Sequence, residues 1–178
     1  MMTKFDFNDG NGPVPAHKHS NGGGWIADTT TVVDTAYVGP DARVYDNAEV
    51  YANAMIYGEA KVHGNAMVYD NAMIYGKARV YDNAWVYGKA RVYGNAMVYG
   101  KAKVHGNTRV YDNAWVYNKA RVYDNARVYN NVKVFDNAMV FSDTCHRLSD
   151  RAEKSDTNED IFIEMNGKRY KLVEVEKS

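Results

Sequence analysis

The chain has 178 residues and carries 22 basic and 22 acidic side chains, so its formal net charge is zero. A balanced chain has no net field to steer a polyanion toward it, and the global charge therefore points to no class of partner. Cys145 is the only cysteine, which excludes an internal disulfide framework and leaves histidine and carboxylate side chains as ligands for any metal site.

The sequence lacks the features of export and membrane insertion. Its start, MMTKFDFNDGNG, has no apolar core of signal-peptide length, and no window approaches the run of about 18 apolar residues that crosses a bilayer. We expect a cytoplasmic protein with no membrane partner, and an association with virions stays open.

Residues 1–25 form a lead-in rich in glycine and proline, with the run GNGPVPAHKHSNGGGW inside it. This composition predicts an irregular N-terminal cap. Four apolar side chains are available to cover the open end of the structure that follows, namely Phe5, Phe7, Val14 and Trp25.

Within the lead-in, His17 and His19 form an H-x-H pair. On an extended segment both rings point to one side, which suits a metal ion. Asp28 is the only further ligand nearby in the sequence. We therefore predict no metal here and expect the two histidines to be solvated or to hydrogen-bond to the first repeat.

Residues 26–144 repeat a six-residue unit, or hexad. An aliphatic residue recurs at every sixth position from Ile26 to Val140, which makes twenty hexads without an insertion. Two residues earlier comes a small side chain, alanine in most hexads, with Thr30 and Thr108 as hydroxyl variants and Val132 as the large exception. Small and β-branched residues two apart lie on one face of a strand, and Gly, Asn or Asp then forms a tight corner.

The unit V-Y-D-N-A-R resembles the hexapeptide repeat of left-handed parallel β-helix proteins, including transferase-hexapeptide-type proteins of bacteria and phages. The resemblance implies an all-β triangular solenoid in which three hexads make one coil of 18 residues. Twenty hexads would then give six to seven coils and a prism roughly 30 Å tall.

The residues after the hexads change character. Residues 145–160 are polar and charged and are expected to form a linker. Residues 161–176 alternate around Asn166-Gly167, which predicts a C-terminal β-hairpin. His146 beside Cys145 lacks the third group that nucleophilic catalysis needs, so we assign it no catalytic role.

His63 and His105 are the catalytic candidates if the protein is an enzyme. The resemblance implies trimeric acyltransferases that bind coenzyme A between subunits and use a histidine as general base. Each of the two histidines replaces the outward tyrosine of its hexad, and counting by coils places them on neighbouring faces, two coils apart. The alternative is that both are tolerated surface aromatics. In such enzymes, loops commonly interrupt the hexads and supply part of the active site. The hexads here are uninterrupted, which argues against an acyltransferase.

Sorting the outward positions by coil places aromatic residues on all three faces. Arg91, Arg109 and Arg127 follow one another beside Tyr93, Tyr111 and Tyr129, while Trp85 and Trp115 lie on the other two faces. One interpretation is that these ladders only stabilise the prism through stacking and cation–π contacts. The other is that they form protein contacts, since interface cores are enriched in Tyr, Trp, Met and Arg. The arginine column could also follow a phosphate backbone, but the zero net charge disfavours nucleic acid.

The sequence therefore favours a non-catalytic scaffold or binding module that self-associates as a homotrimer and contacts proteins through its ladders. The alternative is a coenzyme A-dependent acyltransferase with an inter-subunit site. Apart from coenzyme A in that alternative, we predict no cofactor.

Overall fold

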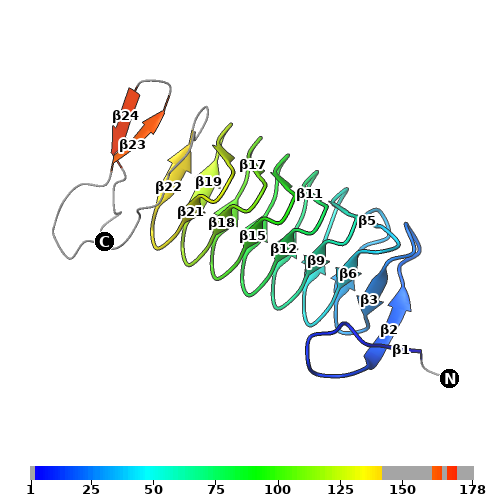
Figure 1. Ribbon diagram of the computed structural model, residues 1–178. Coiled ribbons are helices and arrows are strands. Elements are labelled where there is room, and N and C mark those ends of the chain that lie inside the picture. The colour runs from blue at the N-terminus through cyan, green and yellow to red at the C-terminus, as the bar shows by residue number, and fades with distance from the viewer. Residues whose placement is uncertain (1–2, 142–161, 166–167, 172–178) are drawn as a thin grey trace, which may run out of the picture.

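The computed structural model describes residues 3–141, 162–165 and 168–171, and its main body is a three-sided stack of short strands (Figure 1). The parallel strands β3 to β22 follow the twenty hexads and enclose what we call the prism. The first sheet has the order β1 (Lys4–Phe5), β2 (Val14–Lys18), β3 (Trp25–Ala27), β6 (Arg43–Val44), β9 (Lys61–Val62), β12 (Arg79–Val80), β15 (Met97–Val98), β18 (Trp115–Val116) and β21 (Lys133–Val134).

The other two sheets contain only parallel strands. The second sheet consists of β4 (Thr31–Val32), β7 (Glu49–Val50), β10 (Met67–Val68), β13 (Trp85–Val86), β16 (Lys103–Val104), β19 (Arg121–Tyr123) and β22 (Met139–Phe141). The third sheet consists of β5 (Tyr37–Val38), β8 (Met55–Ile56), β11 (Met73–Ile74), β14 (Arg91–Val92), β17 (Arg109–Val110) and β20 (Arg127–Val128).

Each strand pairs with the strand one coil away. Val80, for example, lies opposite Val62 on one side and Val98 on the other. Three strands complete one coil, so β3 to β22 make six full coils and two strands of a seventh. The predicted all-β, three-sided parallel β-helix is confirmed. Among the described residues, no helix is long and apolar enough to span a membrane.

The interior of the prism consists of the two inward residues of each hexad. Alanines from Ala36 to Ala126 and valines or isoleucines from Val38 to Val128 are almost all fully inaccessible to solvent. A small residue beside each corner lets the chain turn tightly, while the β-branched residue fills the centre. The large exception, Val132, is also buried near the last coil.

Left-handed backbone conformations recur at the first corner residue of many hexads, at Asp46 (φ 59°) and Gly64 (φ 68°) among others. Where this residue is aspartate, its carboxylate can accept a backbone N–H from the corner of the next coil. Asp46 accepts from Gly64 at 3.0 Å, and Asp82 accepts from Gly100 at 3.1 Å. These bonds tie successive corners together, because a charged acceptor strengthens a hydrogen bond.

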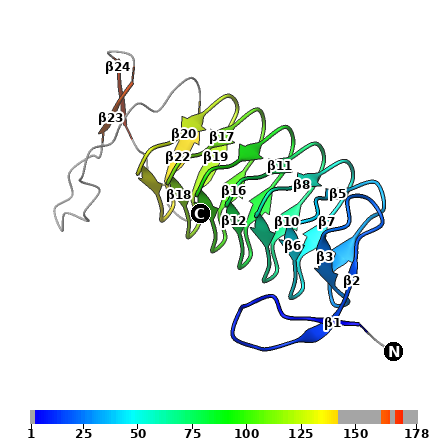
Figure 2. The ribbon, with the colours of Figure 1, turned by 45° about the vertical axis from the view of Figure 1, so that its right-hand side comes forward.

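The lead-in is more regular than expected. β1 pairs with β2 and β2 with β3, both antiparallel, so the lead-in extends the first sheet (Figure 2). Phe7 stacks on Tyr45 with ring centroids 4.9 Å apart, and Phe5 stacks on Trp25 at 4.4 Å. These rings form a cluster separate from the core of the prism, so they pack beside the first coil and do not cover its interior.

A different part of the lead-in covers one edge of the first coil. Val38 donates its N–H to the Asn21 carbonyl at 3.0 Å, and the Gly24 N–H donates to the Val38 carbonyl at 2.9 Å. The segment after β2 therefore satisfies the edge of the third sheet with backbone hydrogen bonds.

Near the C-terminus, β23 (Phe162–Met165) and β24 (Lys168–Lys171) pair antiparallel, with Ile163 opposite Tyr170. This pairing agrees with the predicted hairpin. The Asn166-Gly167 turn, the linker 145–160 and the Cys145-His146 pair lie outside the described residues.

The buried hydroxyl of Thr108 provides a test of the core. It is fully inaccessible and has no hydrogen-bond partner among the described residues. Because an unpaired buried polar group costs about 1–3 kcal/mol, we expect Thr108→Val to raise the free energy of unfolding by about 1 kcal/mol. The measurement is the urea unfolding midpoint.

Thr30→Val is the matched control. The Thr30 hydroxyl donates to the Ala27 carbonyl at 2.7 Å, so the same substitution there should lower the midpoint. If both substitutions change the urea midpoint equally, the unpaired Thr108 hydroxyl does not destabilise the folded chain.

Candidate functional site

The outward aromatic rings stack into three columns, one along each corner of the prism. Neighbouring ring centroids lie between 4.6 Å and 5.5 Å apart. The column at the corner that follows the first-sheet strands contains Phe7, Tyr45, His63, Tyr81, Tyr99, Tyr117 and Phe135. The column that follows the second-sheet strands contains Tyr69, Tyr87, His105, Tyr123 and Phe141. The column that follows the third-sheet strands contains Tyr57, Tyr75, Tyr93, Tyr111 and Tyr129.

Stacking determines which part of each ring can meet a partner. Tyr75 and Tyr93 are 4.8 Å apart with planes 2° from parallel, and Tyr93 and Tyr111 are 4.9 Å apart at 3°. Because each ring covers its neighbours' faces, the columns present ring edges and tyrosine hydroxyl groups. Burial raises the pKa of Tyr93, and it raises the pKa of Tyr45 to about 12, with Asp46 adding to the effect. These hydroxyl groups therefore remain protonated donors at neutral pH.

His63 and His105 are members of two different columns, and the structure does not bring them together. His63 lies between Tyr45 and Tyr81 at 4.6 Å and 5.1 Å. His105 lies between Tyr87 and Tyr123 at 4.8 Å and 5.5 Å. Both imidazoles thus occupy the place of a tyrosine ring, with both faces covered.

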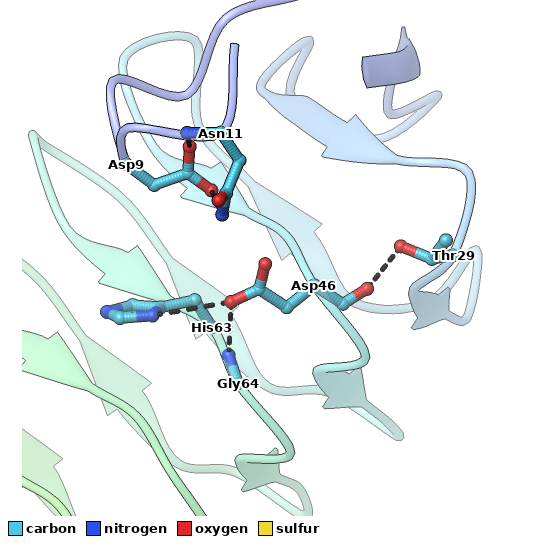
Figure 3. A network of polar contacts seen from close by, with 6 residues as sticks. All are labelled: Asp9, Asn11, Thr29, Asp46, His63 and Gly64. Atoms are coloured by element: carbon cyan, nitrogen blue, oxygen red, sulfur yellow. Dashed lines mark hydrogen bonds and ion pairs between the residues drawn. The ribbon is translucent and has the colours of Figure 1, made fainter. Parts of the chain in front are cut away.

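The surroundings of His63 contain acidic groups (Figure 3). Its Nδ1 lies 3.6 Å from Asp46 Oδ2, the same oxygen that accepts the Gly64 N–H. Burial lowers the pKa of His63, and Asp46 and Asp82 oppose this shift. The pKa of nearby Asp9 is lowered mainly by the hydrogen bond that its carboxylate accepts from the Asn11 N–H, and His63 lowers it further by a smaller amount. Asp46 is thus a structural acceptor as well as a neighbour of the imidazole.

His17 and His19 have different environments despite their H-x-H spacing. His17 is exposed, and its Nδ1 lies 2.7 Å from Asp28 Oδ1. His19 is buried, and its Nδ1 interacts with the backbone of Asn21. Among the described residues, no group of three or more His, Cys, Asp or Glu side chains could hold a metal ion.

The zero net charge hides a separation of charge along the prism. Residues 3–82 contain six basic and ten acidic side chains, a net charge of −4. Residues 83–141 contain nine basic and three acidic side chains, a net charge of +6. The half nearer β22 is therefore basic, and it can attract anionic groups that the global charge does not predict.

The third sheet displays an arginine column within this basic half. Arg91 pairs with Arg109 and Arg109 with Arg127 across adjacent strands, and all three side chains are exposed. The stacked rings of Tyr93, Tyr111 and Tyr129 run beside them. Like charges in directly opposite positions destabilise a sheet, so an anionic partner would relieve their repulsion.

Trp85 and Trp115, predicted as binding residues, are partly covered by lysines from the next coil. Lys103 Nζ lies 4.1 Å from the Trp85 ring centroid, and Lys133 Nζ lies 4.7 Å from that of Trp115. Each lysine is the direct cross-strand partner of its tryptophan. The sequence-based prediction omitted these lysines from the site. Each lies eighteen residues, or one coil, after its tryptophan, so the spacing alone places it on the neighbouring strand.

The position of His63 generates a pH prediction. Because the folded chain binds a proton at His63 less readily than the unfolded chain does, stability should fall as the pH drops below about 6.5. His63→Tyr restores a ring that does not titrate in this range and should reduce that loss. Thermal melting from about pH 8 to about pH 5 measures it.

Tyr81→Phe is the control, since it changes the neighbouring ring without altering a group that titrates in this range. If His63→Tyr and the unaltered chain lose stability equally on acidification, His63 is not the source of the dependence.

The chain is similar to a known repeat over two segments. A family model described as YdcK Beta solenoid repeat matches residues 90–106 and residues 120–134. No curated protein and no solved structure matches the chain. The finer resemblance to transferase-hexapeptide proteins stays a prediction. The match and the stacked coils together support a β-solenoid repeat protein.

Proposed function

We propose that the chain is a non-catalytic scaffold that contacts an acidic protein partner through the third sheet. The observation that carries this proposal is the column of Arg91, Arg109 and Arg127, exposed on adjacent strands of one face. The strands hold the three arginines at a spacing of about 4.8 Å before any partner binds. Little conformational freedom of the backbone is lost on binding, which favours affinity.

The chemistry of the face suits carboxylates. A guanidinium group can donate two parallel hydrogen bonds to one carboxylate. The neighbouring Tyr93 and Tyr111 present ring edges beside the arginines. Since the faces of these rings are covered, they are poorly placed to stack on nucleic-acid bases, and a protein partner is the better fit.

The acyltransferase alternative has less support. His63 and His105 lie in different columns, and stacked rings cover both imidazole faces. Stacking leaves the ring nitrogens at the edge of each column, but the uninterrupted hexads contain no loop that would hold a substrate beside either histidine. We therefore assign both histidines to the columns and predict no turnover of an acyl-coenzyme A. The homotrimer predicted from the resemblance stays a prediction, and it is an alternative to the dimer proposed below. The mass in solution distinguishes the two.

A charge reversal tests the arginine column. Arg109→Glu places an acid between two arginines and should weaken binding of fluorescent poly-glutamate by about tenfold, as expected when charge-assisted contacts are lost. Fluorescence anisotropy at fixed salt measures the affinity. Lys77→Glu, an exposed lysine at a corner of the acidic half, is the control and should change the affinity little.

Two outcomes would contradict this function. Equal losses in Arg109→Glu and Lys77→Glu would show a diffuse charge effect. Tighter binding of single-stranded RNA than of poly-glutamate would favour nucleic acid as the partner.

Calorimetry with acetyl-coenzyme A separates scaffold from enzyme. We expect no saturable heat at about 1 mM ligand, a concentration at the upper end of ordinary substrate affinities. Saturable binding, together with acyl transfer that His63→Tyr or His105→Tyr abolishes, would instead support the acyltransferase.

A further inference from the structure

The second sheet presents an outward face whose charges are arranged around its central strand. We call this the β13 face. From β4 to β22 its outward side chains are Thr31, Glu49, Met67, Trp85, Lys103, Arg121 and Met139. Glu49 is the only acid at the outward strand positions of β3 to β22.

Two positions on this face, Glu49 and Arg121, have opposite charges and lie symmetrically about Trp85. Glu49 lies two coils before Trp85, and Arg121 lies two coils after it. Met67 and Lys103 are one coil away on either side. Turning the face end for end about Trp85 therefore exchanges Glu49 with Arg121 and Met67 with Lys103.

The face is also straight enough to keep such a match over many coils. The planes of Tyr69 and Tyr87 differ by 4°, and those of Tyr87 and His105 by 10°. Successive coils are thus nearly parallel. Two copies of the chain have the same coil spacing, so their side chains remain aligned along the whole contact, whereas a helix with a 5.4 Å pitch would drift.

We propose that the β13 face binds the same face of a second, antiparallel copy, with the twofold axis passing through Trp85. In the alignment that overlaps all seven strands, Trp85 meets its counterpart. Glu49 of each copy then faces Arg121 of the other, at both ends of the contact. A twofold contact uses the same patch on both copies, so each favourable pair occurs twice.

The other arrangements pair charges less well. A parallel contact of the β13 face with itself would place Glu49 opposite Glu49 and Arg121 opposite Arg121. The third sheet has no outward acid at its described strand positions to oppose its arginines. On the first sheet, the lead-in lies against Trp25 and Arg43, where Phe5 stacks on Trp25 and Arg43 donates to the Phe7 carbonyl at 3.3 Å.

The charge separation along the prism favours the same orientation. Reversing one copy brings its basic half, of net charge +6, against the acidic half of the other, of net charge −4. Opposite potentials on two surfaces steer their encounter and suppress the parallel alternative.

The expected affinity follows from the size of the face. Seven strands spaced by about 4.8 Å span roughly 30 Å, and a side about 17 Å wide, the length of an ordinary strand, gives roughly 500 Å² per copy. The total of roughly 1,000 Å² is at the lower limit for a specific interface, so we expect a dimer that dissociates at micromolar concentrations.

Sedimentation velocity tests the dimer with the intact chain. Between about 1 µM and about 500 µM the mass should rise from that of the 20.1 kDa chain to twice that value. Arg121→Glu should weaken the dimer by about tenfold, because it turns two attractive contacts into repulsive ones. Glu49→Arg should do the same, and the double variant Glu49→Arg with Arg121→Glu should restore the affinity.

Arg79→Glu is the matched control. It reverses an exposed arginine at the same position of its hexad, on β12 of the first sheet, and should leave the dimer unchanged. A mass that stays monomeric throughout would overturn the proposal, and so would a trimer or a charge swap that fails to restore the dimer.

This proposal rests on the scaffold function only in assigning protein contacts to outward side chains. The two tests use different faces. Loss of poly-glutamate binding in Arg109→Glu concerns the third sheet, and dissociation in Arg121→Glu concerns the second, so either result can fail while the other stands.

Discussion

The structure depends on backbone hydrogen bonds between strands that lie one coil apart in the stack. Each strand of the prism is two or three residues long and cannot persist alone. Arg79 donates its N–H to the Ala96 carbonyl at 3.0 Å, and Tyr81 donates to the Val98 carbonyl at 3.0 Å. Because this pattern repeats around every coil, each hexad is stabilised by the hexads above and below it, as in other solenoids.

The same spacing aligns the side chains into columns. A strand pairing in steps of one coil places Tyr81 over Tyr99, and Asp82 beside the amide of Gly100. The columns therefore serve the architecture first, since stacking buries ring faces and the corner aspartates satisfy backbone donors. His63 and His105 belong to this structural order, because each imidazole stacks in its column where other hexads have a tyrosine ring.

The functions proposed above depend on the outward residues that vary between hexads. The prism holds Arg91, Arg109 and Arg127 in one row and places Glu49 and Arg121 on either side of Trp85 in another. Such rows run along the length of the rod because its faces are straight. The charge separation between the two halves gives the rod a direction, which a net charge of zero conceals.

The sequence by itself determined the three-sided solenoid, its inward Ala and Val, and which outward residues of the hexads follow one another along each face, because twenty uninterrupted hexads admit one register. Only the tertiary structure decided the path of the lead-in, which has no period to follow. There Phe7 fills the column position that Ala27 leaves without a ring and stacks on Tyr45. It also decided that ring faces are covered, that Lys103 lies over Trp85, and that Asp46 accepts an amide from the next coil. Periodicity specifies which residues are neighbours, whereas side-chain packing decides which of their atoms remain available.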